Sequence, residues 1–225
     1  MSDFYHGSER KQKMKISVFG ATGGVGRRVV EQLLAAGHEV RAIVRDPSRM
    51  ASAGSKLQII TIQDLGNQQA VIAAVQGQDA VVSGIGPRST RDGPVASTAT
   101  TSILNAMGLA GVRRLVTVSA APVGDMPADE GLFGRLILYP VARTLLRAVF
   151  DDLERMEANM WRSGLDCTAV RPPRLTDGPL TGRYRQRVGG SVPRGTVISR
   201  ADTAHAMVAA LDDPATIGRP LGVAN

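Results

Sequence analysis

The chain has almost no cysteine, because Cys167 is the single one among 225 residues. An internal disulfide is therefore excluded, and with it a small extracellular fold held together by disulfides. Cys167 opens the apolar run at residues 167–170. We expect a buried strand there and a structural role for the thiol, since a buried thiol without a cationic neighbour is inert.

Long apolar runs are also missing, and none approaches the ~18 consecutive residues that a membrane-spanning helix requires. The amino terminus carries no apolar signal segment. We therefore expect a cytoplasmic protein that makes no contact with membranes. Residues 1–13 are polar without a periodic pattern, which predicts a disordered leader, and residues 14–225 then form one domain.

Lysine is scarce: four of the 27 basic residues are lysines, and the last of them is Lys56, so the other 23 are arginines. The formal net charge of +7 is dispersed along the chain. We interpret this charge as solvated surface and expect no nucleic-acid partner. Neither His38 nor His205 has a cysteine, histidine or carboxylate at metal-ligand spacing, so we expect no metal.

Short β-branched runs alternate with amphipathic stretches along the chain, which is typical of repeated βαβ units. The fold class predicted is α/β, a doubly wound parallel sheet of the Rossmann type. The predicted strands are residues 15–19, 39–44, 57–62, 80–83, 114–119 and 167–171. The predicted helices are one ending at Gly37, then residues 67–75, 95–110, 132–162 (interrupted near Pro140, with Gly164 as the stop) and 201–211. Residues 172–225, with strand-like pieces at 182–188 and 196–199, are expected to form a small carboxyl-terminal lid.

Three glycines, Gly20, Gly23 and Gly26, stand at i, i+3 and i+6 between the first strand and the first helix. The first allows a tight turn, the second lets the backbone approach a diphosphate, and the third lets helix and strand pack closely. The helix N–H groups then face the phosphates. This context predicts dinucleotide binding, and the spacing is typical of short-chain dehydrogenases. We also expect the other turn residues Thr22, Gly24 and Val25 to bind the cofactor.

The end of the second strand carries arginine where an NAD-preferring site would place a carboxylate. Arg45 stands at the strand end and Arg49 lies four residues on, so two guanidinium groups are available for a 2′-phosphate. Asp46 complicates this reading, because it could hold a ribose hydroxyl, but it precedes Pro47 and also suits a turn. We expect NADP to be preferred over NAD.

The catalytic Tyr-x-x-x-Lys pair of carbonyl-reducing short-chain dehydrogenases is absent. Tyr139 and Tyr184 are followed four residues later by Arg143 and Val188, and no lysine follows Lys56. Ordinary interconversion of alcohols and ketones by that pair is therefore not expected. The remaining possibilities are a hydride transfer that needs little help from a protein acid, and binding without turnover.

The carboxylates of the last long helix are interpreted as a solvated face that includes Arg155. They are Asp151, Asp152, Glu154 and Glu157. Met156 and Trp161 are expected in the core.

Several segments together resemble a known family: residues 20–26, 44–49, 77–81, 169–182 and 197–202. The most specific are the Pro172-Pro173 pair, the Pro-Leu-Thr-Gly turn at residues 179–182 and the Val-Ile-Ser segment at residues 197–199. The chain resembles the atypical short-chain dehydrogenases of the NAD(P)H-binding group that includes biliverdin IXβ reductase, also called flavin reductase. The resemblance covers nearly everything after Met14.

The resemblance implies roles for the matched positions. Those expected near adenine are Asp64 and Leu65, and those lining the cofactor after the fourth strand are Gly84, Ile85, Gly86 and Arg88. Ser119 would lie beside the nicotinamide. Alternatively, Ser119 is only a residue at a strand end whose polar groups form hydrogen bonds with the backbone. The backbone of Pro172 and Pro173 would hold the nicotinamide carboxamide.

One departure from the family concerns Arg174, because relatives commonly carry a histidine directly after the two prolines. An arginine cannot donate a proton at ordinary pH, but it attracts an anionic acceptor. We therefore expect an NADPH-dependent reductase in which Ser119 and Arg174 orient a planar small-molecule acceptor. We expect this acceptor to be a flavin or a quinone, and a linear tetrapyrrole is less expected. A flavin would be a substrate and not a bound cofactor.

The alternative from another class is a redox sensor or regulator of the NmrA-like kind, which binds the nucleotide without turnover. Sugar-nucleotide or lignan-type chemistry is less expected, because the acid and base pair is missing. We expect a monomer or a weak homodimer.

Overall fold

The structure is a computed structural model that describes residues 12–50, 54–86, 93–124, 131 and 144–225. Most of the expected leader, the first part of the helix predicted over residues 132–162, and Arg88 lie outside the described residues. The predictions made for them, and the division into a leader and one domain, stay predictions.

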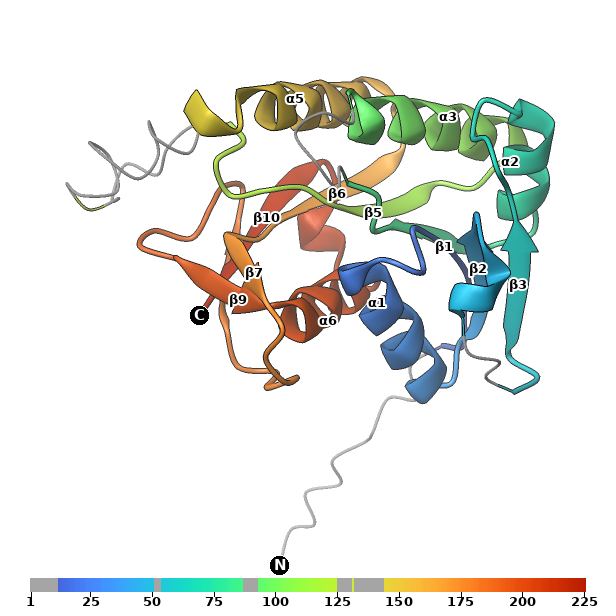
Figure 1. The fold of residues 1–225 in the computed structure, drawn as a ribbon, viewed down its shortest axis with the longest axis horizontal. Helices are drawn as coiled ribbons and strands as arrows, with labels where there is room; N and C mark the ends of the chain where they lie inside the picture. Colours follow the sequence, from blue (N-terminus) through green and yellow to red (C-terminus); the bar gives the residue numbers. More distant parts are fainter. Residues whose placement is uncertain (1–11, 51–53, 87–92, 125–130, 132–143) are drawn as a thin grey trace, which may run out of the picture.

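Eight strands form one mostly parallel sheet in the order β3-β2-β1-β4-β5-β6-β10-β8 (Figure 1). Only β8 runs antiparallel, against β10. The strands of this sheet are β1 (Lys15–Phe19), β2 (Glu39–Val44), β3 (Leu57–Thr61), β4 (Ala80–Ser83), β5 (Arg114–Val118), β6 (Asp166–Arg171), β8 (Arg185–Val188) and β10 (Arg219–Ala224). The strand order reverses between β1 and β4, which is where open α/β sheets bind their ligands. The predicted Rossmann-type fold is confirmed.

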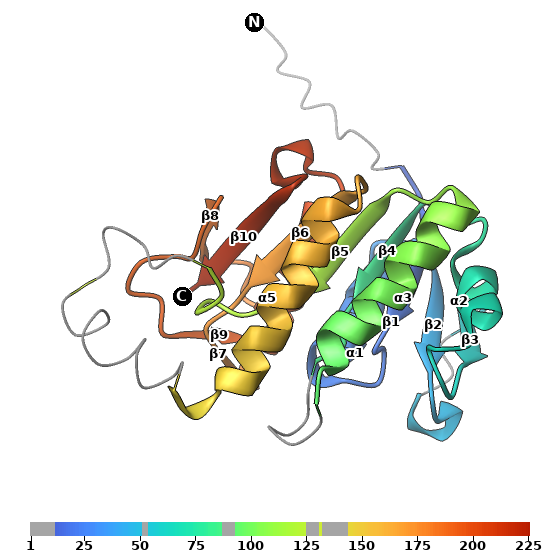
Figure 2. The ribbon, with the colours of Figure 1, turned by 90° about the horizontal axis from the view of Figure 1, so that it is seen from above.

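Helices cover both faces of the sheet (Figures 1 and 2). On one face α1 packs against α6, and on the other α3 packs against both α2 and α5. The helices are α1 (Gly24–Ala35), α2 (Gln68–Val75), α3 (Val95–Ala110), α5 (Arg147–Arg162) and α6 (Arg200–Ala210). No described helix combines the length and the apolar character that a membrane crossing requires.

The strand β1 shows why the sheet is buried on both sides. Ile16 and Val18 belong to the apolar cluster beneath α1 and α6, whereas Phe19 belongs to the cluster beneath α2, α3 and α5. All three side chains are fully buried. Because both faces need apolar cover, the strand is an almost continuous apolar run instead of an alternating one.

The carboxyl-terminal part is built into the main sheet more fully than a small lid implies. The strand β10 pairs in parallel with β6, and β8 continues the sheet beyond it. Two strands stand apart as a parallel pair, β7 (Arg174–Thr176) and β9 (Val197–Ser199). The prediction missed β7 and β10. Its other strands and helices start and end within three residues of the observed bounds, except that α5 begins at Arg147, 15 residues after the predicted start at residue 132.

Candidate functional site

The glycine turn lies where β1 and β4 end side by side. Gly20 has φ +70°, and a Cβ added to it would stand 2.9 Å from the carbonyl carbon of Gly84. A Cβ on Gly26 would collide with the carbonyl oxygen of Gly20, and one on Gly84 would stand 3.1 Å from the Gly26 Cα. These three backbones are therefore in contact, so that a side chain is excluded at Gly20 and Gly26 and would be tight at Gly84. This close approach is the cradle that a dinucleotide diphosphate requires, so the residues present fit that group.

The start of α1 faces this cradle, and no side chain among the described residues caps its N–H groups. Gly23 is the N-cap, it has no side chain to offer, and the first turn of α1 holds no acidic residue. Gly24 is exposed, whereas Thr22 and Gly23 are half-buried and Val25 is buried. A helix end with this composition attracts an anion by its N–H groups and its dipole.

The end of β2 places Arg45 and Arg49 on the surface, and both side chains are exposed. Arg45 follows the last residue of β2, and its carbonyl accepts a 2.8 Å hydrogen bond from Gln63 Nε2. Arg49 closes a short 3-10 turn, Pro47–Arg49.

Asp46 serves as the cap of that turn. Its Oδ1 accepts hydrogen bonds from Ser48 Oγ at 2.7 Å and from the Ser48 N–H at 3.0 Å. These bonds, helped by the charge of Arg49, lower the pKa of Asp46. The carboxylate is thus engaged within its own turn, as the turn reading of Asp46 predicts.

The residues expected near adenine lie in the connection after β3. Asp64 Oδ1 accepts a 2.8 Å hydrogen bond from the Gly66 N–H, and the Leu65 carbonyl accepts one from Ser102 Oγ at 2.5 Å. Ile85, after β4, donates its N–H to Ser83 Oγ at 3.4 Å. The connections after β3 and β4 therefore have defined conformations beside the glycine turn.

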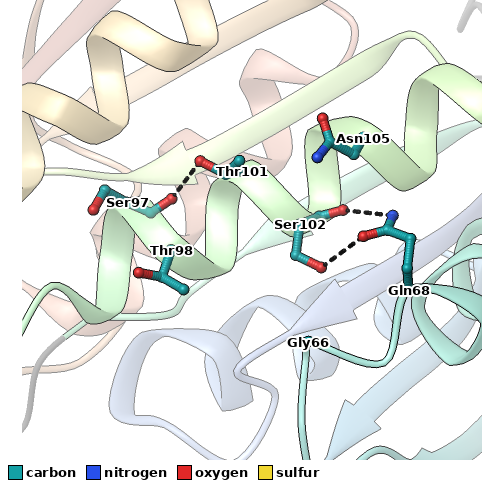
Figure 3. A pocket seen from close by; sticks show the side chains of 7 residues that line it. All are labelled: Gly66, Gln68, Ser97, Thr98, Thr101, Ser102 and Asn105. Atoms are coloured by element: carbon teal, nitrogen blue, oxygen red, sulfur yellow. Dashed lines mark hydrogen bonds between the residues drawn. The ribbon is translucent and has the colours of Figure 1, made fainter.

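A polar pocket of about 380 Å³ adjoins this region, between the connection after β3 and the side of α3 (Figure 3). Within it Gln68 Nε2 donates to the Ser102 carbonyl at 3.3 Å, and Ser102 Oγ contacts Gln68 Oε1 at 3.4 Å. None of the predicted site residues that the structure describes lines it; the lining residues are Gly66, Gln68, Ser97, Thr98, Thr101, Ser102 and Asn105.

Ser119, Glu157 and Arg171 form a buried network at the carboxyl ends of β5 and β6. Ser119 Oγ donates a 2.6 Å hydrogen bond to Glu157 Oε1. Arg171 donates from Nε to Oε1 at 2.9 Å and from its terminal nitrogen to Oε2 at 2.6 Å. The glutamate and arginine side chains are only 3% and 9% exposed, so this is a two-point ion pair shielded from water.

The network corrects the prediction that the carboxylates of α5 form a solvated face. Glu157 is buried, and Asp152 is buried too and accepts from the N–H groups of Ala96 at 2.8 Å and Ser97 at 3.1 Å. Asp152 therefore caps the start of α3 from the neighbouring helix. Trp161, expected in the core, is 37% exposed, whereas Met156 is buried as predicted.

The Ser119 backbone is held as a strand-end residue would be, since its N–H donates to the Val170 carbonyl at 2.7 Å. Its hydroxyl, however, is engaged by Glu157 and not by backbone. The next turn is fixed by the Ala121 N–H, which donates to the Pro172 carbonyl at 2.8 Å. The carboxyl ends of β5 and β6 are thereby joined beside the predicted nicotinamide position.

Pro172 is buried, Pro173 is half-buried, and Arg174 is exposed at the first position of β7. No interaction of the Arg174 side chain is seen with the part of the chain that the structure describes. Its charge is therefore open to solvent, and its predicted role in the site stays a prediction.

Asp202 fixes the Pro-Leu-Thr-Gly turn onto α6. Its side chain accepts from the N–H groups of Thr181 at 2.8 Å and Gly182 at 2.9 Å, and from Thr181 Oγ1 at 2.9 Å. Ser199 Oγ lies 3.1 Å from it. Burial alone raises the pKa of Asp202, but these hydrogen bonds outweigh it and leave the pKa below its ordinary value.

Cys167 is fully buried in β6, and burial raises the pKa of its thiol to about 11. The predicted burial of the Cys167 thiol is confirmed. Within the described ranges, no three histidine, cysteine or acidic side chains are grouped as a metal site requires.

Solved structures with the same fold include a short-chain dehydrogenase/reductase from Veillonella parvula in complex with NADP. It has a TM-score of 0.79 at 18% identity, over 95% of each chain. An anaerobilin reductase from Escherichia coli O157:H7 has a TM-score of 0.75 at 22% identity, covering 93% of this chain and 96% of that one. At these identities the likeness concerns the fold.

Two curated relatives are similar in sequence. An uncharacterised chloroplastic protein of Arabidopsis thaliana is 31% identical over 208 residues, which is 88% of this chain and 71% of the relative. A 3-diazoavenalumate denitrifying reductase from a Streptomyces species is 36% identical over 202 residues, or 80% of this chain. The chain spans 62% of that reductase's length.

Residues 20–214 match the protein family described as NAD(P)H-binding. The match begins at the first glycine of the turn and ends after α6, so it includes both the cradle and the network around Glu157. The resemblance to NAD(P)H-binding reductases is confirmed at this level. The chain belongs to the NAD(P)H-binding family, and one of the relatives similar to it in sequence is named a reductase.

Proposed function

We propose that the protein is an NADPH-dependent reductase that passes hydride to a planar small-molecule acceptor, a flavin or a quinone. The observation that carries this proposal is the 2.6 Å hydrogen bond from Ser119 Oγ to Glu157. Glu157 is also paired with Arg171 at two points, so the serine proton is engaged by a buried carboxylate. The hydroxyl oxygen then offers lone pairs, which suits holding a ligand N–H better than protonating a substrate.

The missing Tyr-x-x-x-Lys pair favours an acceptor that needs no protein acid for hydride transfer. A ketone needs a proton on its oxygen as hydride arrives, and the Tyr-x-x-x-Lys pair that supplies it elsewhere is missing. A flavin or a quinone delocalises the incoming electron pair over its rings. The reduced nicotinamide supplies two electrons and one proton as hydride, and the acceptor takes its second proton from water. Orientation and proximity in the site then supply most of the rate.

Arg45 and Arg49 support NADPH as the preferred donor. Both are exposed beyond β2, and the one nearby carboxylate, Asp46, is engaged by Ser48. A carboxylate held in its own turn through Oδ1 is a weaker competitor for the ribose hydroxyls. Two exposed guanidinium groups, with the carboxylate between them held in its own turn by Ser48, favour a 2′-phosphate.

Arg174 supports an anionic acceptor. It stands directly after Pro172 and Pro173, is exposed, and begins the small β7–β9 unit. A flavin phosphate or a carboxylate on a quinone would pair with it. A linear tetrapyrrole is less favoured, because Arg174 supplies charge and no transferable proton.

The experiment is a turnover assay with NADPH, FMN and a carboxylated quinone, following the absorbance of the reduced nicotinamide. Consumption of NADPH with at least one of these acceptors is expected. The Arg174→Gln variant should raise the KM for FMN and leave the Kd for NADPH unchanged. Absence of turnover with every planar acceptor contradicts the proposal. If NADPH nevertheless binds, a regulator that senses the nucleotide is the function left standing, and the missing Tyr-x-x-x-Lys pair agrees with that reading.

A further inference from the structure

The side chain of Arg200 lies beside the start of α1. Arg200 is the first residue of α6, and α6 packs along α1. A Cβ added to Gly24 would stand 2.7 Å from Cδ and 2.8 Å from Nε of Arg200. Gly24 is the first residue of α1, so this guanidinium lies at the mouth of the glycine turn.

The positive charge of Arg200 is unfavourable beside the amino terminus of α1. A helix amino terminus carries partial positive charge, and a cation placed there is unfavourable. The N-cap Gly23 has no side chain, and the first turn of α1 contains no acidic residue to offset the charge. An anion between the N–H groups of α1 and the guanidinium would satisfy both.

The ion pair between Arg200 and Asp177 is exposed to water. Asp177, in the connection after β7, accepts a hydrogen bond from Arg200 at 2.8 Å, and its side chain is 88% exposed. The Arg200 side chain is 32% exposed. An ion pair this open to water contributes little to stability, so replacing its carboxylate by another anion costs little.

We propose that Arg200 is a ligand of the dinucleotide diphosphate and that it exchanges Asp177 for the phosphates when the nucleotide binds. This inference rests on the proposed function, because it requires the dinucleotide to lie on the glycine turn. The diphosphate is common to NADPH and NADH. Arg200 therefore sets affinity for both nucleotides, whereas Arg45 and Arg49 discriminate between them.

The test is calorimetric titration of the Arg200→Met variant with NADPH, NADH and adenosine 2′-monophosphate. Loss of one charge-assisted contact should weaken both dinucleotides by about tenfold or more. Adenosine 2′-monophosphate has no diphosphate, so its affinity should not change. The control is Arg28→Met, which removes an equally charged arginine from α1 that pairs with Glu31 at 3.0 Å, away from the turn. It should leave all three affinities as they are.

The exchange itself is tested by Asp177→Asn, which removes the competing carboxylate and should tighten NADPH binding by up to about fivefold. Unchanged or weaker binding of NADPH in that variant overturns the exchange. Wild-type affinity for both dinucleotides in Arg200→Met overturns the assignment of Arg200. Failure of the wild-type protein to bind either dinucleotide counts against the proposed function instead, so the two failures are distinct.

Discussion

The hydroxyl of Ser119 donates a 2.6 Å hydrogen bond to Glu157, a buried carboxylate that lies on the helix after the strand that Ser119 follows. Arg171 completes the network from the end of β6. Three elements are thus joined at the place where the acceptor is proposed to bind. The same contacts bear on stability and on the orientation of the serine.

Glu157→Gln should lower the free energy of unfolding by about 3 kcal/mol, because it leaves the buried Arg171 without a counter-charge. Urea unfolding followed by circular dichroism measures this. The control is Asp151→Asn, whose partner Arg147 lies 3.7 Å away in an exposed pair. That change should have little effect. Equal stability of the two variants would show that the buried pair contributes nothing.

Gly26→Ala should disrupt the glycine turn, because the added Cβ collides with the Gly20 carbonyl oxygen. The forced backbone shift should cost roughly 1–3 kcal/mol of stability and abolish tight NADPH binding. The matched control is Gly108→Ala in α3, where a Cβ meets nothing within 4 Å. That substitution should raise stability by about 0.5–1 kcal/mol. Retention of NADPH binding by Gly26→Ala would contradict the close approach.

The stabilising effect of Asp202 should depend on pH. Its pKa in the folded protein lies below the ordinary value of 3.8, so the carboxylate adds stability that is complete above that value. This stability is lost as the pH falls through the folded-state pKa. Wild type and Asp202→Asn should therefore differ most near neutral pH and converge below pH 3.8 in urea unfolding. A difference that stays constant down to strong acid would be at odds with the hydrogen bonds from Thr181 and Gly182.

Cys167 should react slowly with a thiol reagent. With a pKa of about 11, roughly one thiol in a thousand is ionised at pH 8, and the group is also buried. Labelling of the native protein should be at least about 100-fold slower than labelling in guanidinium chloride. Similar rates in the two conditions would mean that β6 opens readily.

Replacing Arg45 by Asp should weaken NADPH binding by about tenfold or more and leave NADH binding equal or stronger. The guanidinium is exposed beyond β2 and is proposed to contact only the 2′-phosphate. Fluorescence titration with both nucleotides measures the ratio. An equal loss of affinity for NADPH and NADH would contradict the proposal that Arg45 binds the 2′-phosphate.

The alternating fold and the glycine turn were predictable from the sequence, because each depends on residues close together in the chain. Gly20, Gly23 and Gly26 lie within one strand–turn–helix unit. Because of this spacing, the turn brings the backbones of Gly20 and Gly26 into contact. The strand β10 was not predicted, because the segment Arg219–Ala224 contains Pro220 and Gly222, which disfavour strands. Its pairing with β6 overrides that local preference.

The network around Glu157 was missed for a related reason. Its partners Ser119 and Arg171 are 38 and 14 residues away, so no local pattern connects them. A signal was present, however: Glu157 follows buried Met156 and precedes buried Met160 by three positions, on the apolar side of α5. A carboxylate at such a position implies a buried partner.

The most direct test of the account is calorimetric titration of the wild-type protein with NADPH and NADH. The account predicts saturable binding of both at one site per chain, with NADPH the tighter ligand, and no tight binding of NADPH by Gly26→Ala. If neither coenzyme produces heat or a shift in the thermal unfolding of the wild-type protein, the glycine turn holds no dinucleotide. The proposed reductase function then fails with it.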